Sequence, residues 1–444
     1  MGDSRQPWKD NVAPAGARAR WAPWLAYAVV LLAAPLLWRS GFGLSLLSQV
    51  GIAIVACLAY NVLFGQGGML SFGHAVYSGL GAYLAIHTMN MAAQGAWPVP
   101  IVLVPLAGGL AGLGVAAVFG AVSLRRAGTP FAMITLGIGE MVWAAALMVP
   151  EVFGGEGGIS ADRTAAPLAL GADFGPQWQV ALLISVYCLA CTAAMHAWTR
   201  TPAGRLLNAV RDNPERVAFL GASPVRVRYL AFLVSGLFSG IAGGLAAVNF
   251  EIVTPEVLGA SRSATLLLFV FLGGSGAFFG PILGAVLMVF SMVLLSSWTP
   301  AWLLYLGLAF MVMVVVAPGG LAGLYLAHRR LAARARGSEL AVTYLALAVA
   351  GGAALLGLAA MIEMAYHLGL GSSVGPTKRF LGVALDTRGA HAWAGAALLA
   401  LAGAALLRLA ARRLARQRRE APASKPRDAA SDGAIPGGQA GGRW

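Results

Sequence analysis

The sequence predicts an all-α polytopic membrane protein. Of its 444 residues, 59% are hydrophobic and only 11% are charged, far from the composition of ordinary soluble domains. Many windows of roughly 20 residues are apolar enough to cross a bilayer. Tryptophans at positions 21, 24 and 38 flank the first such window, as expected for side chains at a membrane interface. We therefore expect the bilayer, rather than water, to surround most of the chain.

Twelve apolar segments follow one another along the chain. About ten of them form the predicted core, and the last two are additional C-terminal helices. The segment 262–275 is short and runs into GGSGAFFG, so it could be a half-helix, a re-entrant piece or a tight interior span. The segments are 21–38, 42–62, 69–90, 98–123, 130–149, 177–199, 228–250, 262–275, 277–297, 300–317, 339–366 and 391–411.

The basic residues predict the orientation of these segments. Arginines cluster after the fourth, sixth, tenth and twelfth segments, whereas acidic residues occupy alternate loops. Because positive loops stay in the cytoplasm, both termini are expected there, with the chain in the bacterial inner membrane. A miscount of two segments would preserve this pattern. Topology also explains the formal charge of +14 better than nucleic-acid binding does.

Amino-acid composition and charge divide the chain into five predicted parts. The first 317 residues contain polar interruptions, whereas the last third is rich in Ala, Leu and Gly and ends in a tail of low-complexity composition. The expected parts are a basic cytoplasmic tail at 1–20, a membrane core at 21–317, a basic linker at 318–338, a two-helix extension at 339–411 and a disordered tail at 412–444.

The stretch FGQGGMLSFGHAVYSGLGAYLA at 64–85 is unusually polar and glycine-rich for a membrane helix. Glycine and serine allow tight helix contacts, which is one interpretation. The alternative is a translocation path, because Gly65, Gly67 and Gly68 would let the chain break where protein or water covers the backbone. His74 lacks the partners of a metal site, and no metal is expected.

Glu140, in TLGIGEM, is an ionisable residue inside an apolar segment. Such a group is costly in a bilayer unless it faces a cavity or a partner. It could otherwise reach water at a helix end or bond to a neighbouring helix.

The long basic loop at 200–226 predicts two short helices. The first is amphipathic and covers 203–210. The second has Asp212 or Asn213 as its N-cap, Pro214 at its first position and Gly221 as its stop. A capped helix pair of this kind suits docking to another protein, although a solvated connector is the alternative.

The loop FGGEGGIS at 153–160 is turn-rich, but it lacks the ending of a phosphate-binding P-loop. No Walker sequence occurs elsewhere in the chain. We therefore expect the chain to bind no cofactor itself, and any ATP that drives it to lie on another subunit.

Five stretches together resemble the larger permease type of ABC importers for branched-chain amino acids, over roughly residues 24–317. Permeases for urea and short amides are similar, so these substrates are the alternative. The stretches are NVLFGQGGMLSFGHAVYSGLGAYLA at 61–85, TPFAMITLGIGEMV at 129–142, FGGEGGIS at 153–160, TPAGRLLNAVRDNPERVAFLG at 201–221 and VFLGGSGAFFGPILGAVLM at 270–288.

The resemblance implies partners and site residues. The partners are a companion permease, expected as a heterodimer rather than a second copy, two ABC ATPase subunits and a soluble substrate-binding protein on the outer side. The chain itself would not be an enzyme. The implied coupling residues are Arg211, Asp212, Asn213, Glu215 and Arg216; those near the path are Gly67, Gly68, Ser71, Phe72, Gly73 and His74, with Glu140; and the loop facing the binding protein contains Gly154, Gly155 and Glu156.

Two other classes of protein fit less well. A secondary transporter driven by an ion gradient would need paired acids inside the membrane, and Glu140 is the main one. A membrane enzyme would need converging catalytic groups, whereas the six histidines are scattered singly along the chain. The extension after residue 338 departs from the family pattern and carries no nucleotide-binding motif.

Overall fold

The computed structural model describes residues 17–38, 40–125, 128–165, 174–332, 337–369, 377–380, 383–387 and 389–420. These form two compact units, Met1–Leu324 and Tyr325–Trp444, each of which is described by itself. The predictions for residues 1–16 and 421–444 lie outside the described residues.

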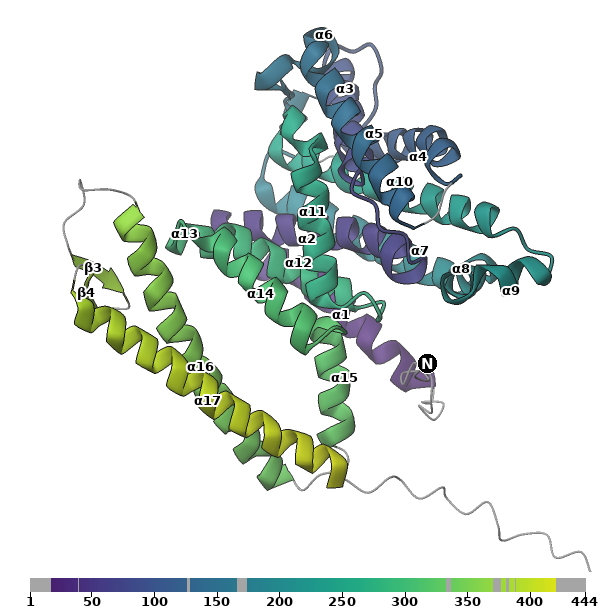
Figure 1. Ribbon diagram of the computed structural model, residues 1–444. Coiled ribbons are helices and arrows are strands. Elements are labelled where there is room, and N and C mark those ends of the chain that lie inside the picture. The colour runs from purple at the N-terminus through teal and green to yellow at the C-terminus, as the bar shows by residue number, and fades with distance from the viewer. Residues whose placement is uncertain are drawn as a thin grey trace, which may run out of the picture. The chain divides into compact units, whose positions relative to one another are not determined.

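The first unit is a helical bundle (Figure 1). Its longer helices are α1 Ala17–Leu37, α2 Gly41–Asn61, α3 Ala75–Ala93, α4 Val104–Ser123, α5 Thr129–Met148, α7 Gln177–Arg200, α10 Pro224–Phe250, α11 Ala260–Gly273, α12 Gly280–Phe290 and α14 Trp302–Val316. Its shorter elements are α6 Pro150–Phe153, α8 Pro202–Asp212, α9 Pro214–Phe219, α13 Ser296–Trp298, the π-turns η1 Val62–Gln66 and η6 Ser291–Leu295, the 3₁₀ turns η2 Ile101–Leu103, η3 Gly155–Gly157, η4 Arg163–Ala165 and η5 Pro255–Leu258, and strands β1 Ile159–Ser160 and β2 Ile252–Val253.

The prediction of an all-α polytopic membrane protein is confirmed. Within the described residues, eight helices are long and apolar enough to cross a membrane, or nine if α14 and the following helix α15 (Gly320–Ala332), bent by 47°, form one span. Helix α11 has 14 residues, so it is about 21 Å long and shorter than the bilayer core. Most helix bounds lie within a few residues of the predicted apolar segments.

Helix α10 is the centre of the first unit and packs against α2, α3 and α4. Its glycines allow the close approach, because a Cβ on Gly244 would lie 2.8 Å from the Cα of Pro105 in α4. A Cβ on Gly81 of α3 would lie 2.7 Å from the Cα of Gly240. Small residues thus bring three helix backbones together, which is the usual packing of helices in membranes.

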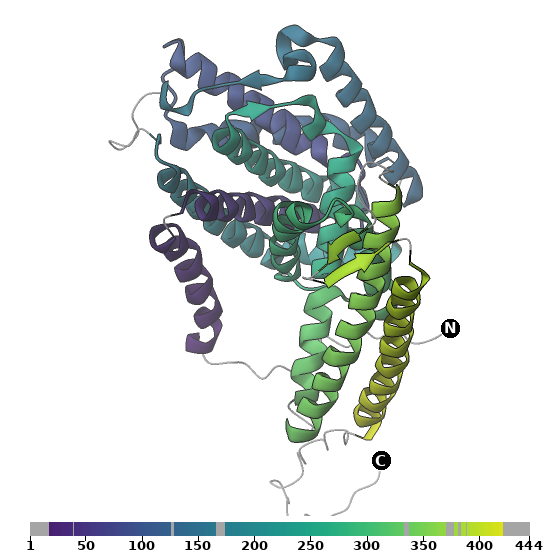
Figure 2. The ribbon, with the colours of Figure 1, turned by 90° about the vertical axis from the view of Figure 1, so that its left-hand side faces the viewer.

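The second unit contains two long antiparallel helices, α16 Gly337–Gly369 and α17 Ala390–Glu420, which lie side by side (Figures 1 and 2). A Cβ on Gly403 would lie 2.7 Å from the Cα of Ala354, so a glycine contact joins them. A hairpin of β3 Thr377–Phe380 and β4 Val383–Asp386 lies between them in sequence. The sequence does not predict this hairpin.

Helices also occupy parts of the predicted basic linker and of the predicted tail. Helix α15 lies within 318–338, where we expect a linker, and α17 continues to Glu420 within the predicted disordered tail. Strong helix formers, chiefly Ala and Leu, make up most of LAGLYLAH at 321–328, and all of RLAARRLARQ at 408–417. Within the described residues, the arginines of these two segments therefore lie inside helices.

Candidate functional site

Residues 62–74 form a break between α2 and α3. The π-turn η1 widens the end of α2, and Gly68 adopts a left-handed conformation with φ +65°. A side chain at Gly65 would collide with the side chain of Asn61 and with the carbonyl oxygen of Ser275. The glycines of this stretch therefore serve a sharp break and a close backbone contact, and we call residues 62–74 the helix break.

The part of the helix break that contains Ser71 and His74 is buried among aromatic rings. The His74 ring lies between Tyr60 and Tyr77, with ring centroids 4.8 and 5.7 Å away. The Tyr60 hydroxyl donates to the carbonyl oxygen of Ser71 at 2.8 Å. Neither nitrogen of His74 nor the Oγ of Ser71 has a hydrogen-bond partner among the described residues. The structure thus places both side chains in the interior rather than on an open surface.

The helix break is held against α5. The backbone N–H of Phe72 donates to Thr135 Oγ1 at 3.2 Å, and a Cβ on Gly139 would lie 3.3 Å from the Cα of Gly73. A side chain on Gly73 would collide with the carbonyl of Thr135. Gly73 is therefore a packing position between the helix break and α5.

A hollow of about 350 Å³ lies between the helix break and the first turns of α5. Gly67, Gly68 and Phe72 line one side, and Phe131 and Leu136 lie on α5. Three of the predicted path residues therefore share one cavity, and Ser71, Gly73 and His74 lie behind it.

Glu140 lies apart from this hollow, on the exposed face of α5. Met133, Leu136 and Met141 are exposed on the same helix, which is long and apolar enough to span a membrane. A carboxyl group on such a face is costly in lipid. This face of α5 consequently suits contact with another protein or with a water-filled path.

Helices α8 and α9 form a capped pair, as the sequence predicts. The Thr201 hydroxyl accepts from the N–H of Gly204 at 3.3 Å, and Asn213 Oδ1 accepts from the N–H of Arg216 at 2.9 Å. Asn213 rather than Asp212 is thus the N-cap of α9, and Gly221 follows it with φ +83°. We call α8 and α9 the short helix pair.

The short helix pair is bonded to the helix break. The Arg211 guanidinium donates to the carbonyl oxygen of Gly65, and Asn208 Nδ2 donates to Gln66 Oε1 at 2.9 Å. A Cβ on Gly68 would lie 2.7 Å from Cγ of Arg211. The sequence analysis missed Asn208 and Gln66, because only the fold brings these distant positions together.

The predicted coupling residues therefore have different surroundings. Arg211 points to the helix break, whereas Asp212, Glu215 and Arg216 are exposed. The sequence analysis also missed Phe219 and Leu220, which end the pair with 91% and 76% of their surface exposed. Their position as two apolar residues directly before Gly221, which ends the helix, could have identified them in the sequence.

The opposite end of α10 carries a platform of loops, residues 150–165 and 251–258. The 27 residues of α10 place this loop platform roughly 40 Å from the short helix pair. Strand β1 pairs with β2, and Asn90 Nδ2 donates to the carbonyl oxygen of Ser160 at 3.1 Å. Gly154 and Gly155 both have positive φ, and Glu156 is exposed beside them.

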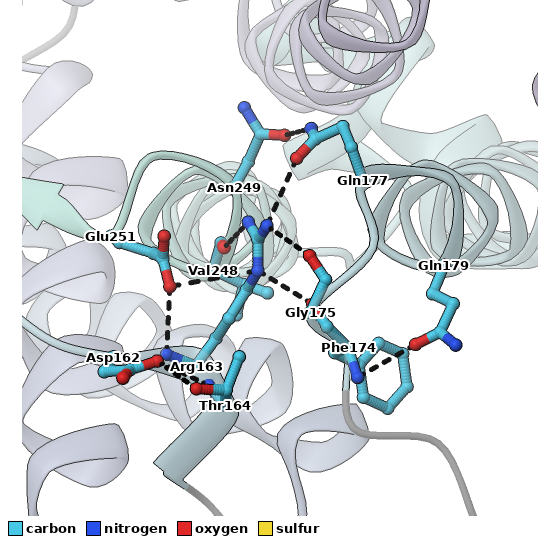
Figure 3. Close-up of polar contacts among 10 residues, drawn as sticks. All are labelled: Asp162, Arg163, Thr164, Phe174, Gly175, Gln177, Gln179, Val248, Asn249 and Glu251. Atoms are coloured by element: carbon cyan, nitrogen blue, oxygen red, sulfur yellow. Dashed lines mark hydrogen bonds and ion pairs between the residues drawn. The ribbon is translucent and has the colours of Figure 1, made fainter. Parts of the chain in front are cut away.

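Buried Arg163 holds the loop platform together (Figure 3). Its guanidinium donates to the carbonyl oxygens of Phe174 at 2.8 Å, Gly175 at 3.1 Å and Val248 at 3.5 Å. It also donates to the side chain of Gln177 at 3.3 Å. Its backbone N–H donates to Glu251 at 3.0 Å.

The sequence analysis did not single out Arg163. The available signal was its position in a loop expected outside the cell, where the positive-inside pattern makes a basic residue exceptional. Because its contacts include the last turn of α10, it joins the loop to the central helix.

Comparison with known proteins places this sequence in a family. The family described as "Branched-chain amino acid transport system / permease component" matches residues 42–317. The high-affinity branched-chain amino acid transport system permease protein LivM of Salmonella typhimurium is 30% identical over 320 residues, 67% of this chain and 73% of that protein. LivM of Escherichia coli is 31% identical over 296 residues, 61% of this chain and 67% of that protein.

A more distant relative is the fructose import permease protein FrcC of Rhizobium meliloti, which is 26% identical over 231 residues, 47% of this chain and 61% of that protein. No solved structure matches the chain significantly. The family match includes the helix break, α5, the short helix pair and the loop platform. This chain therefore belongs to the family of permease components of branched-chain amino acid transport systems.

Proposed function

We propose that the chain is the membrane permease subunit of an ATP-driven importer of branched-chain amino acids. The family match and the two LivM relatives support the substrate class. The observation that carries the mechanism is the bonding of the short helix pair to the helix break, through Arg211 and Asn208.

The short helix pair is the docking site for an ATPase subunit. Phe219 and Leu220 offer exposed apolar area at its end, and apolar anchors surrounded by polar residues are typical of protein interfaces. Glu215 and Arg216 lie exposed beside them. When the ATPases close, a displacement of α8 moves the helix break through Arg211 and changes the hollow beside α5.

The exposed face of α5 is the contact with a companion permease, and the translocation path runs between the two chains. Glu140 faces this path or a polar group of the companion. Gly67, Gly68 and Phe72 line the hollow beside it. The companion is a different chain, so that the pair is a heterodimer.

The loop platform receives the soluble binding protein on the outer side of the bacterial inner membrane. Glu156 and the neighbouring glycines are accessible there. Both termini and the short helix pair lie on the cytoplasmic side, in agreement with the basic loops. ATP binds to the partner subunits.

Uptake by proteoliposomes tests this proposal. The chain is purified with its co-expressed permease, ATPases and binding protein, and radiolabelled leucine uptake is measured with ATP inside the vesicles. We expect uptake that requires ATP, persists with a proton ionophore and is inhibited by isoleucine but not by urea. If an ion gradient drives uptake without ATP, the protein is a secondary transporter. If urea is transported and leucine is not, the substrate class is urea and short amides instead of branched-chain amino acids.

A further inference from the structure

A second cavity lies inside the first unit, away from the hollow at the helix break. It has a volume of about 510 Å³, is lined by residues of α2, α3, α10, η5, α11, α12 and η6, and is partly open to the surface. Small-molecule sites commonly measure about 300–1,000 Å³. Phe250 and Thr254 line it near the loop platform, whereas Ala56 and Ser78 lie deeper in the bundle. The cavity thus extends from the platform end into the membrane core.

The cavity lining combines a large apolar part with one charge of each sign. Among its lining residues, Arg262 is the one cation and Glu256 the one acid, and no histidine contributes. Gln49 and Thr265 add uncharged polar groups. The remaining wall is mostly aliphatic and includes Leu266.

Arg262 is the strongest sign that the cavity has a ligand. It lies in the first turn of α11, is half-buried, and its guanidinium has no hydrogen bond or ion pair within the part of the chain that the structure describes. The guanidinium of Arg163, by contrast, donates four hydrogen bonds. A guanidinium has five donors suited to a carboxylate, and those of Arg262 are not used by the described residues.

We infer that this cavity binds a zwitterionic amino acid with an aliphatic side chain. The Arg262 guanidinium pairs with the carboxylate, Glu256 attracts the ammonium group, and the aliphatic wall holds the side chain. The opposite charges of the two residues disfavour a purely anionic ligand, such as a phospholipid headgroup, because Glu256 would repel it. The inference rests on the proposed function for the choice of an amino acid, and it adds a site within this one subunit.

Binding of leucine to the intact importer in nanodiscs, without the soluble binding protein, tests the inference. Leucine is compared with leucinamide, which lacks the carboxylate, and with 4-methylpentanoate, which lacks the ammonium group. We expect the wild type to prefer leucine to both analogues. Arg262→Gln should weaken leucine binding at least about tenfold and abolish the preference over leucinamide, because the charge-assisted bonds are lost.

Glu256→Gln should instead abolish the preference over 4-methylpentanoate. Arg125→Gln is the matched control, since Arg125 is exposed and lies outside the cavity, and it should behave as the wild type. A general structural defect would weaken the binding of leucine, leucinamide and 4-methylpentanoate equally and would leave both preferences for leucine unchanged. Equal weakening of all three ligands would therefore overturn the inference.

Two further outcomes separate the inference from the proposed function. Wild-type ATP-driven leucine uptake with unchanged binding in both cavity variants overturns the cavity site alone. Absence of ATP-driven leucine uptake by the wild type overturns the proposed function and the choice of ligand together. If anionic lipid binds in the cavity and leucine does not, the cavity is a site for a lipid headgroup and the inference is wrong.

Discussion

The two ends of α10 hold their neighbouring segments in different ways. At the loop platform, buried Arg163 bonds to three backbone carbonyl groups and to Gln177, and its N–H bonds to Glu251. At the short helix pair, partly exposed Arg211 bonds to the carbonyl of Gly65 and pairs with its neighbour Asp212. Many buried polar contacts resist local opening more than a few exposed ones do, although Leu207, Val210 and Val217 of the short helix pair are also buried. The short helix pair thus has the weaker set of polar contacts, and our proposal assigns to this end the transmission of a displacement.

The largest expected effect is the loss of ATPase binding when the end of the short helix pair becomes charged. The double variant Phe219→Asp, Leu220→Asp should weaken ATPase binding about 100-fold, since buried apolar anchors contribute most of an interface's energy. Co-purification from mild detergent measures it, with Phe219→Leu as the control that keeps the apolar area. Equal ATPase recovery with both variants would remove the docking assignment.

The next effect concerns stability at the loop platform. Arg163→Met should lower the free energy of unfolding by about 2–4 kcal/mol, because it leaves buried carbonyl groups without donors. Thermal unfolding in detergent measures it, and exposed Arg125→Met serves as the control. An unchanged melting temperature for Arg163→Met would show that these contacts do not hold the platform.

Loss of the contact between the short helix pair and the helix break should affect function more than stability. We expect Arg211→Met to retain the ATPase and ATP hydrolysis but to reduce leucine uptake about tenfold, as one charge-assisted hydrogen bond is lost. The ratio of leucine imported to ATP hydrolysed measures coupling. A normal ratio would show that displacement passes through other contacts.

The smallest effect is expected at the rim of the loop platform. The hydroxyl and N–H of Thr164 donate to Asp162 and hold the pKa of that carboxyl below its usual range. A lowered folded-state pKa contributes stability above the unfolded value, and this stability is lost as the pH falls through the folded value. Melting temperatures of wild type and Asp162→Asn should therefore differ by a small, constant amount between pH 6 and 8. A difference that changes across this range would indicate another titrating group.

Local sequence rules predicted much of this architecture. The apolar segments gave most helix bounds, because each span must satisfy its own backbone in lipid. The caps of the short helix pair were predictable since Asn213, Pro214 and Gly221 act on adjacent backbone groups. The break after residue 61 followed from its glycines. The roles of the coupling and path residues remain predictions.

The sequence by itself determined a helical membrane protein, its order of segments and the family to which it belongs. Only the tertiary structure decided which polar residues meet, because Arg211 and Gly65 are 146 positions apart, and Arg163 and Val248 are 85 apart. The cavity around Arg262 likewise joins residues of seven helices and turns. Periodicity and capping act over a few residues, whereas these contacts depend on how closely glycine-lined helices pack.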